Sequence, residues 1–485
     1  MGPFRISSRL GGLAAAFGLS ACAALGPNFK PPAPPAAAGY LMQGDATPAS
    51  VHIGDKAGAD RPWWRALGSP DLDAVMAEAL NDNQTVASAD ATLQRLRDVA
   101  AAQRGGLYPQ VGVNAGLQRE RINTQVFGFP GFPSPTINLY TIGGLVSYDL
   151  DVFGGQKRRI EAADAQAAAQ ALRADAAYLT LTADVAMAAA QIADLNARIE
   201  VFGAIAKDDE TTIAIIRKAQ AAGGDAPSAT NGAQARLAQD LAGLPPLQQD
   251  LARERHALAI LVGKAPSAWT PPAFSVETFA PPATLDLAVP STLVRRRPDI
   301  QAAEADLHAK TALVGVATAN LYPDLRLTAG LTQESLSPGS LFDYASTAYN
   351  FGGQLTAPIF DGGTLKAQRR AAQADARASL AQYRQTVLAA LGEVADALTA
   401  VAHDDQRLAD LNRAEAVAQA SMLDARNAFR LGGRPQSDMV LAQGELDRAR
   451  LARVDAQGQR LADIVTLLAA TAGDWRDAPR PISKS

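Results

Sequence analysis

The stretch that decides the fold is YLTLTADVAMAAAQIADLNARIEVF, residues 178–202. Its seam residues recur at spacings that alternate between three and four. They are Tyr178, Leu181, Val185, Ala188, Ile192, Leu195, Ile199 and Phe202. This spacing is typical of a coiled-coil seam. The proline-free helical pattern runs for about 60 to 70 residues, or some 90 to 105 Å at ~1.5 Å per residue. Because an ordinary globular core does not need such helices, we expect a wall of long, closely packed helices.

The same ladder occurs a second time, 209 positions further on. Its members are Leu380, Tyr383, Val387, Ala390, Val394, Ala397, Val401, Leu408 and Leu411, with Asp404 as the one intrusion. Upstream of each ladder, a helix, a Tyr-Pro break and a strand are predicted over 86–117 and again over 300–331, and the proline-rich stretch 265–290 lies between the halves. The chain is therefore predicted to be an internal two-fold repeat.

Each long helix is predicted to end at a glycine pair, Gly223-Gly224 in the first half and Gly432-Gly433 in the second. A further helix follows at once, with Pro435 just inside its start, as expected for helix caps. Each half is thus expected to fold as two long helices joined by a tight tip.

The N-terminus has the features of a secretory signal. Arg5 and Arg9 precede a short apolar run that ends in Leu19-Ser20-Ala21-Cys22. This tetrad resembles a bacterial lipobox, which implies an acylated Cys22 as the first residue of the mature chain. Ala23 stands where an aspartate would signal retention in the inner membrane, so the resemblance points to the outer membrane.

Two predicted strand pairs alternate apolar and polar residues. On 109–118 the apolar positions are Val111, Val113, Ala115 and Leu117, and on 323–332 they are Leu325, Leu327, Ala329 and Leu331. The return strands place Tyr140, Ile142, Val146, Tyr148 and Leu150 on one face in the first half, and Phe351, Leu355 and Ile359 in the second.

Alternation alone is compatible with a soluble antiparallel sheet, but export favours a transmembrane barrel. No other apolar run reaches the ~18 to 20 uncharged residues of a spanning helix. Four strands cannot close a barrel, and lipid does not tolerate open edges. We therefore expect several copies of the chain, giving eight, twelve or sixteen strands for two, three or four copies.

Composition argues against other classes of function. The 485 residues carry 45 basic and 49 acidic side chains, a net charge of −4, so no global basic field is available for nucleic acid. The single cysteine excludes an intrachain disulfide, and the four histidines are scattered singly. We find no GxSxG, HExxH, Walker or GxGxxG motif, so an enzyme is not expected, nor a metal or cofactor besides the lipid on Cys22. His403-Asp404-Asp405 is interpreted as part of a hydrated helix face, and Arg295-Arg296-Arg297 as a solvated cap before a helix.

Six motifs in order resemble the TolC-type outer-membrane efflux proteins, in particular the NodT-like lipoprotein branch that serves resistance-nodulation-division (RND) pumps. They are the stretches 26–32 (GPNFKPP), 63–70 (WWRALGSP), 149–154 (DLDVFG), 295–304 (RRRPDIQAAE), 358–363 (PIFDGG) and 473–475 (GDW). The resemblance implies a mainly α fold with β: a homotrimer with a twelve-stranded transmembrane barrel and a periplasmic tunnel of helices. It implies a passive exit duct in the outer membrane, working with a periplasmic adaptor (membrane fusion protein) and an inner-membrane RND pump.

The expected organisation follows the repeat. The segments are a signal peptide (1–21), a lipidated N-terminus with an equatorial segment (22–75), the first repeat (76–263), an equatorial linker (264–294), the second repeat (295–470) and an equatorial tail (471–485). The duct of a type I secretion system and a coiled-coil lipoprotein scaffold without a pore are the alternatives.

The resemblance also implies site residues. Asp438 corresponds to an aspartate of the periplasmic gate, and Leu441 stands where many relatives carry a second aspartate. A ring of carboxylates would be sensitive to pH, whereas a Leu441 ring would close by apolar contact; a solvated aspartate at a helix start is the simpler alternative. The implied adaptor-docking tips are Arg217, Ala222, Gly223, Gly224, Arg430, Leu431, Gly432 and Gly433, although the glycines are also explained as helix stops.

Overall fold

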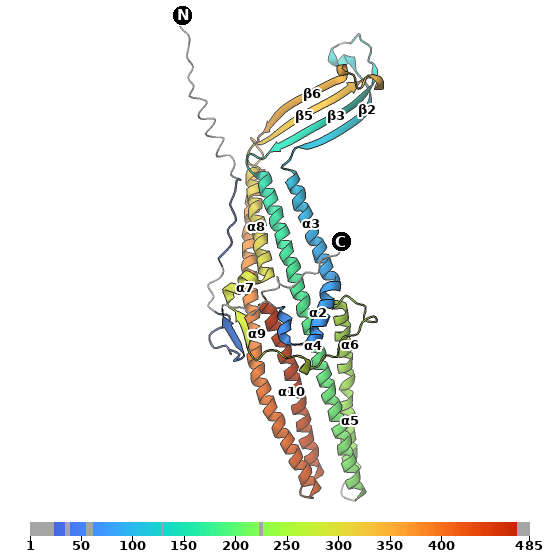
Figure 1. Cartoon of the computed structure of the whole chain (residues 1–485), viewed down its shortest axis with the longest axis vertical. Coiled ribbons are helices and arrows are strands. Elements are labelled where there is room, and N and C mark those ends of the chain that lie inside the picture. The colour runs from blue at the N-terminus through green and yellow to red at the C-terminus, as the bar shows by residue number, and fades with distance from the viewer. Residues whose placement is uncertain (1–23, 34–38, 55–61, 129, 223–226, 473–485) are drawn as a thin grey trace. The chain divides into compact units, whose positions relative to one another are not determined.

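The computed structural model describes residues 24–33, 39–54, 62–128, 130–222 and 227–472 (Figure 1). Cys22, the signal segment and residues 473–485 lie outside the described residues. The chain divides into two compact units, and each takes pieces from both halves of the sequence. The first unit comprises 1–32, 92–170 and 303–383, and the second comprises 33–91, 171–302 and 384–485.

The order helix, strand, strand, long helix occurs twice along the chain. Its elements are α3 (Gln84–Gly105), β2 (Gln110–Arg121), β3 (Thr136–Leu150) and α4 (Gly155–Ala221), then α8 (Pro298–Ala319), β5 (Asp324–Ser335), β6 (Thr347–Thr356) and α9 (Thr364–Arg430). Both α4 and α9 are 67 residues long, which confirms the predicted long helices.

The return helices differ between the halves. The second half has one continuous helix, α10 (Gln436–Thr471), whereas the first has two, α5 (Pro227–Ala242) and α6 (Leu244–Leu261). The expectation of a single long return helix in the first half was therefore wrong. Pro245 and Pro246 occupy the first turn of α6, and their missing N–H groups and fixed φ start a new helix there.

The first unit contains a four-stranded antiparallel sheet in the order β2-β3-β5-β6, seen as a curved ribbon in Figure 1. The register aligns one apolar row across all four strands, through Val111, Val146, Ala329 and Phe351. A parallel row joins Val113 to Gly144, Leu331 and Tyr349. Because directly opposed residues share a face, the apolar positions of all four strands form one continuous surface.

The other face of the sheet is mainly polar. Gln110, Ser147 and Thr328 stand opposite one another there. One predicted member of the apolar face was wrong, because β6 ends at Thr356 and Ile359 lies beyond it, 99% exposed. Pro358 cannot donate to a strand ladder, which is consistent with the strand ending before it.

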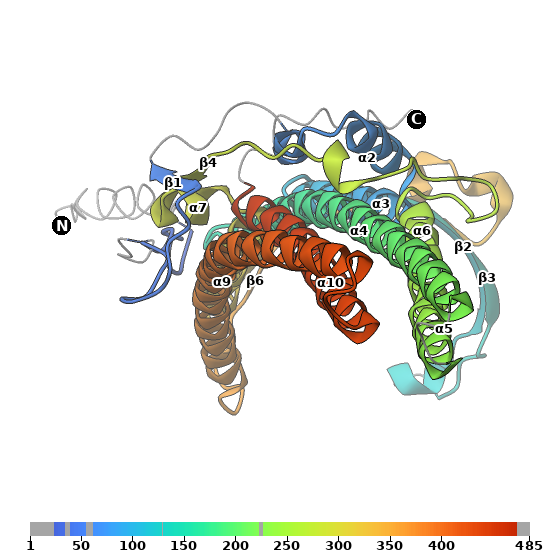
Figure 2. The ribbon, with the colours of Figure 1, turned by 90° about the horizontal axis from the view of Figure 1, so that it is seen from below.

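The second unit is built on the predicted seams. Val185, Ile192, Val394 and Val401 are fully buried, and all four belong to one core cluster. Seen from below, α9 lies beside α10 and α4 beside α5 in a curved row of helices (Figure 2).

Short elements cover these seams in the second unit. Strand β1 (Val51–Gly54) pairs in parallel with β4 (Leu285–Ala288), so the chain before the first half meets the segment between the halves. Large side chains such as Trp64, Leu72 and Phe274 join the same core. The other short elements of the second unit are α2 (Pro70–Asp82), α7 (Pro290–Arg296) and the 3-10 turns Trp63–Leu67 and Val276–Thr278. The first unit contains the 3-10 turns Thr124–Phe127, Pro338–Ser340 and Tyr344–Ser346.

Hydropathy alone does not distinguish the two long helices from membrane spans. Each contains an 18-residue window of mean hydropathy 1.3 with no more than two charged residues. Half of the window in α4 and a third of that in α9 are buried within the chain. The seam of each helix therefore accounts for part of its apolar character.

Two charged motifs are less solvated than expected. Arg297 is only 9% exposed, and its guanidinium donates to Asp299 (2.7 Å) and Glu393 (2.8 Å), so the interpretation of this residue as a solvated cap was wrong. Asp404 is 8% exposed on α9, although its neighbour His403 is exposed. Burial and the nearby Asp463 on α10 raise the pKa of Asp404 to about 7. His403 fits the predicted hydrated face, whereas Asp405 is half-buried and forms an ion pair with Arg460.

The close approach of α10 to α4 depends on a glycine. A Cβ built at Gly458 would lie 2.0 Å from Asp194 Oδ1 and 2.4 Å from its Cγ. We predict that Gly458→Ala lowers the free energy of unfolding by about 1–3 kcal/mol, because the helices must separate. Gly203→Ala on α4, where a Cβ would meet nothing within 4 Å, is the matched control. Thermal unfolding of the purified variants measures the difference, and equal stabilities would contradict this account.

Candidate functional site

The tip between α9 and α10 is closed by a glycine cap. Gly432 adopts a φ of 75°, which only glycine takes readily. The Gly432 N–H donates to the Phe429 carbonyl (3.0 Å) and the Gly433 N–H to the Ala428 carbonyl (2.9 Å). These two bonds form a Schellman motif, which ends the helix by satisfying its last carbonyls. Pro435 is the N-cap of α10, one residue before the position expected from the sequence.

The predicted docking residues at this tip face outward in the isolated chain. Leu431 is 85% exposed and Arg430 is also exposed. At the tip of the first half, Arg217 and Ala222 are exposed, while Gly223 and Gly224 lie outside the described residues. The described part of each tip thus presents a cation and at least one small or apolar residue to a partner.

The predicted gate residues lie in the first two turns of α10. Asp438 is half-buried and its N–H donates to the Pro435 carbonyl (3.2 Å). Leu441 is 68% exposed. Residues three apart on a helix are neighbours on its surface, so Asp438 and Leu441 present a carboxylate and an apolar group side by side.

A partly buried ionic cluster, which the sequence analysis did not predict, joins α4, α5 and α10. Arg236 of α5 lies 2.5 Å from Asp447 of α10, 3.5 Å from Asp209 of α4 and 3.5 Å from Asp240 of its own helix. Gly444 makes room for it, because a Cβ there would lie 2.7 Å from Arg236 Nη1. We call Arg236, Asp209, Asp240 and Asp447 the Arg236 cluster.

The Arg236 cluster has three carboxyl groups for one guanidinium. Asp209 is 3% exposed, and burial raises its pKa to about 7, reinforced by Asp240 and Asp447 and opposed by Arg236. One carboxyl oxygen each of Asp209 and Asp240 lacks a hydrogen-bond partner. Burial is thus the largest cause of the raised pKa of Asp209, and a side-chain hydrogen bond with Asp240 adds to it.

The sequence contained a signal for this cluster. Beyond Phe202, the seam of α4 continues through the buried residues Ile205, Ile213 and Ile216. Asp209 occupies the seam position between Ile205 and Ile213. A carboxyl group on a seam position needs a partner, because burial of an unpaired charge is costly. Within the described ranges, no group of three or more acidic, histidine or cysteine side chains is arranged to hold a metal ion.

A second set of ion pairs holds α10 to both long helices. Arg450 of α10 donates to Asp208 of α4 (2.9 Å) and to Gln419 of α9 (3.1 Å). Arg453 pairs with Glu415, also on α9. Side-chain ionic contacts as well as apolar packing therefore connect α10 to α4 and α9.

Comparisons with known proteins agree with this architecture. The sequence profile described as "Outer membrane efflux protein" matches residues 75–264 and 289–473, well over half of the chain. The chain is 27% identical over 466 residues to the pyoverdine export outer membrane protein OpmQ of Pseudomonas aeruginosa, covering 94% of this chain and 96% of that protein. It is 25% identical to the probable outer membrane lipoprotein SilC of Salmonella typhimurium, covering 95% and 97%.

A solved structure has the same fold. The outer-membrane channel OprN superposes with a TM-score of 0.85 at 27% identity, covering 94% of this chain and all of that one. The sheet with one apolar face, the two long helices and the matched residues lead to one conclusion: the chain belongs to the outer membrane efflux protein family and is an efflux channel protein of the outer membrane.

Proposed function

We propose that three copies of this chain form the exit duct of a tripartite efflux system, with a twelve-stranded barrel in the outer membrane and a tunnel of helices in the periplasm. The observation that carries the proposal is the four-stranded sheet with one continuous apolar face. Within the described residues, β2 and β6 each pair on one side only. Pairing of β2 with β6 of the next copy satisfies both edges, and the apolar face is then directed toward lipid.

The internal repeat supports a tunnel wall of twelve helices, four from each of three copies. The two matched blocks of the family profile fall one in each half of the chain. Two hairpins of long helices per copy contribute evenly to a closed wall, and alanine-rich seams allow neighbours to pack closely. Residues 22–75 comprise, in this proposal, the lipidated N-terminus and an equatorial segment. The equatorial segment forms a belt with 264–294 and 471–485, supported in the described part by the β1–β4 pair and its packing on the seams.

A lipid on Cys22 anchors the mature chain to the outer membrane. The lipobox-like tetrad supports this assignment, as does the similarity to SilC, whose name describes a probable lipoprotein. Several acyl chains give stable anchoring, which a single chain does not. No other cofactor is part of the proposal.

The helix tips form the periplasmic end. Arg217, Ala222 and Gly223-Gly224 in the first half, with Arg430, Leu431 and Gly432-Gly433 in the second, dock a periplasmic adaptor that connects the duct to an inner-membrane RND pump. Asp438 and Leu441 line the closed gate, where three-fold symmetry repeats each side chain around the axis. The exposure of Leu431 and Leu441 in the isolated chain supports burial in an assembly.

Conductance across a planar bilayer tests the duct directly. We expect the purified full-length protein to migrate as a trimer and to insert with discrete conductance steps, because only a closed barrel leaves an aqueous pore. A stable trimer without conductance even after the gate is opened by mutation would indicate a scaffold without a pore. Capture of an ATP-driven partner by crosslinkers at positions 222 and 431 would indicate type I secretion in place of RND efflux.

The gate assignment predicts an opening variant. Asp438→Ala combined with Leu441→Ala should raise single-channel conductance and sensitise cells to large antibiotics several-fold, because both side chains that narrow the axis are removed. Leu423→Ala, which truncates an exposed leucine on α9, is the control for loss of apolar surface. Unchanged conductance and unchanged sensitivity in the double variant would refute the gate.

The Arg236 cluster gives the tips a pH dependence with a defined sign. The folded-state pKa of Asp209, about 7, is higher than its ordinary value of 3.8. Between these values the folded protein binds a proton that the unfolded chain does not. The stabilisation is therefore complete below about pH 4 and is lost as the pH rises through about 7.

Hydrogen exchange measures the direction in which the stability of this region changes with pH. We predict that amide protection in α5 falls between pH 5 and pH 8 in the wild type, by about 1 kcal/mol or more. Asp209→Asn keeps the shape without the charge and should flatten the dependence. Asp424→Asn, an exposed position on α9, should retain the wild-type profile. A profile of Asp209→Asn as steep as that of the wild type would show that Asp209 does not titrate in this range.

A further inference from the structure

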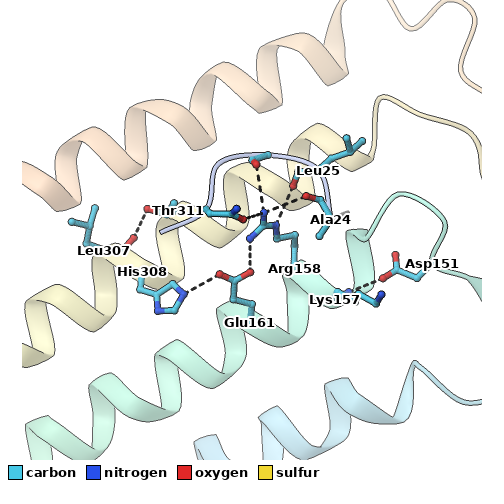
Figure 3. Close-up of polar contacts among 11 residues, drawn as sticks. Ala24, Leu25, Asp151, Lys157, Arg158, Glu161, Leu307, His308 and Thr311 are labelled. Carbon is cyan, nitrogen blue, oxygen red and sulfur yellow. Dashed lines mark hydrogen bonds and ion pairs between the residues drawn. The ribbon is translucent and has the colours of Figure 1, made fainter. Parts of the chain in front are cut away.

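The first described residues of the chain are bound by its own helices. Residues 24–29 lie across the start of α4 and along α8 (Figure 3). The Leu25 N–H donates to the carbonyl of Phe153 (3.2 Å), in the turn between β3 and α4. This segment begins two residues after Cys22 and contains the start of the motif at 26–32.

Arg158 is the centre of these contacts. Its side chain is only 5% exposed, and its Nε donates to the Leu25 carbonyl (3.1 Å). Its Nη2 donates to the carbonyls of Ala24 (3.3 Å) and Gly26 (3.4 Å) and to Asn28 Oδ1 (2.7 Å). A guanidinium has five N–H donors in a fixed plane, and here most of them are directed at one short peptide.

The charge of Arg158 is compensated on the other side. Its Nη1 donates to Glu161 Oε2 (2.6 Å), and Glu161 Oε1 lies 2.9 Å from His308 Nε2. Hydrogen bonds from His308 and Arg158 and their charges lower the pKa of Glu161 despite its burial. The His308 ring in turn stacks on Phe29, with centroids 4.4 Å apart and planes 11° from parallel.

Three glycines allow the segment to come this close. A Cβ on Gly154 would lie 2.5 Å from Ala24 Cα, and one on Gly26 would lie 2.5 Å from Gly315 Cα. A Cβ on Gly315 would lie 2.8 Å from the Leu25 carbonyl oxygen and 2.8 Å from Arg158 Cγ and Cδ. The surface thus has a steric fit to this peptide as well as donors for its carbonyls.

We propose that Gly154, Arg158, Glu161, His308 and Gly315 form a seat for the chain's own residues 24–29, which fixes the point from which the lipid anchor leaves the protein. This inference rests on the proposed lipidation of Cys22. An anchor two residues before Ala24 is tethered within about 7 Å of a fixed backbone, at ~3.5 Å per residue. The seat lies beside the end of β3, so the acyl chains enter the bilayer close to where its apolar row ends at Leu150.

This placement has a physical purpose. The apolar face of the sheet and the acyl chains both require a hydrocarbon environment. Because the seat holds residues 24–29 in place, both can enter the same membrane together. A freely moving N-terminus would tether the protein without orienting it. Arg158, Glu161 and His308 are thus positioning residues for the anchor.

A spin label on the segment tests the seat in the full-length, membrane-reconstituted protein. Lys30 is exposed and directly follows the bound residues, so Lys30→Cys carries the nitroxide without touching the seat. We expect an immobilised spectrum in the wild-type background and in Gly392→Ala, where a Cβ meets nothing within 4 Å. Gly315→Ala should raise the mobile fraction about tenfold, because its Cβ overlaps Leu25 and Arg158 while a helix favours alanine over glycine.

A second variant protects the test against misfolding. Phe29→Ala alters only the bound segment, so it should release the label without affecting the helices. A mobile label in the wild-type background, or an immobile one in both Gly315→Ala and Phe29→Ala, would overturn the seat.

The mass of the N-terminal peptide separates this inference from the proposed lipidation. Acylated Cys22 together with a mobile wild-type label refutes the seat and leaves the lipid assignment intact. Unmodified Cys22 together with an immobile label refutes the lipid assignment, and with it the role in anchoring, while the bound segment remains. Gly315→Ala is expected to be acylated as fully as the wild type, because the seat acts on position and not on modification.

Discussion

A strand edge inside a lipid bilayer has no water to satisfy its N–H and C=O groups, and the proposed assembly depends on this constraint. The sheet has four strands, one apolar face and two edges without a partner in the described chain. Neither a larger core nor a covering helix is present in the described part of the first unit to protect those edges. In the proposed assembly, closure by further copies of the same sheet requires the helices that continue from β3 and β6 to close as well. The proposed barrel and tunnel would then share one symmetry.

The helices need a different constraint. In a wall of helices with purely apolar seams, one helix could shift along its neighbour from one register to another. In the second unit the seams of α4 and α9 are interrupted by buried carboxyl groups, Asp209 and Asp404, each beside a second carboxyl from a neighbouring helix. Such pairs are costly unless protonated or paired with a cation, and they fit only one alignment of the helices. The Arg236 cluster therefore fixes the register of α4, α5 and α10 at some cost in stability.

Much of this fold could be predicted from the sequence, because its main signals are periodic. The ladder from Tyr178 to Phe202 predicted the period of α4, and the proline-free pattern around it predicted the length of the helix. The alternation at Val111, Val113 and Leu117 predicted β2. The errors occurred where a single residue overrides the period. Pro245 and Pro246 divide the first return helix, and Pro358 leaves Ile359 outside its strand. The partners of Arg297 and Asp209 could not be predicted, because periodicity does not specify contacts between helices. Glu393 lies 96 positions from Arg297. Arg236 is closer to Asp209 in the sequence, but it comes from a different helix.

The role of the motif at 26–32 could not be predicted from the sequence either. In the sequence it carried only a family resemblance, since GPNFKPP has no periodicity to interpret. The structure gives three of its residues a physical role: Gly26 passes against Gly315, Asn28 accepts from Arg158 and Phe29 stacks on His308. Each of these contacts joins the segment to a helix that begins or ends at the four-stranded sheet. In the proposed arrangement, the same helices that carry the strands position an anchor attached to this segment. One chain would then specify both its attachment to the membrane and its depth in it.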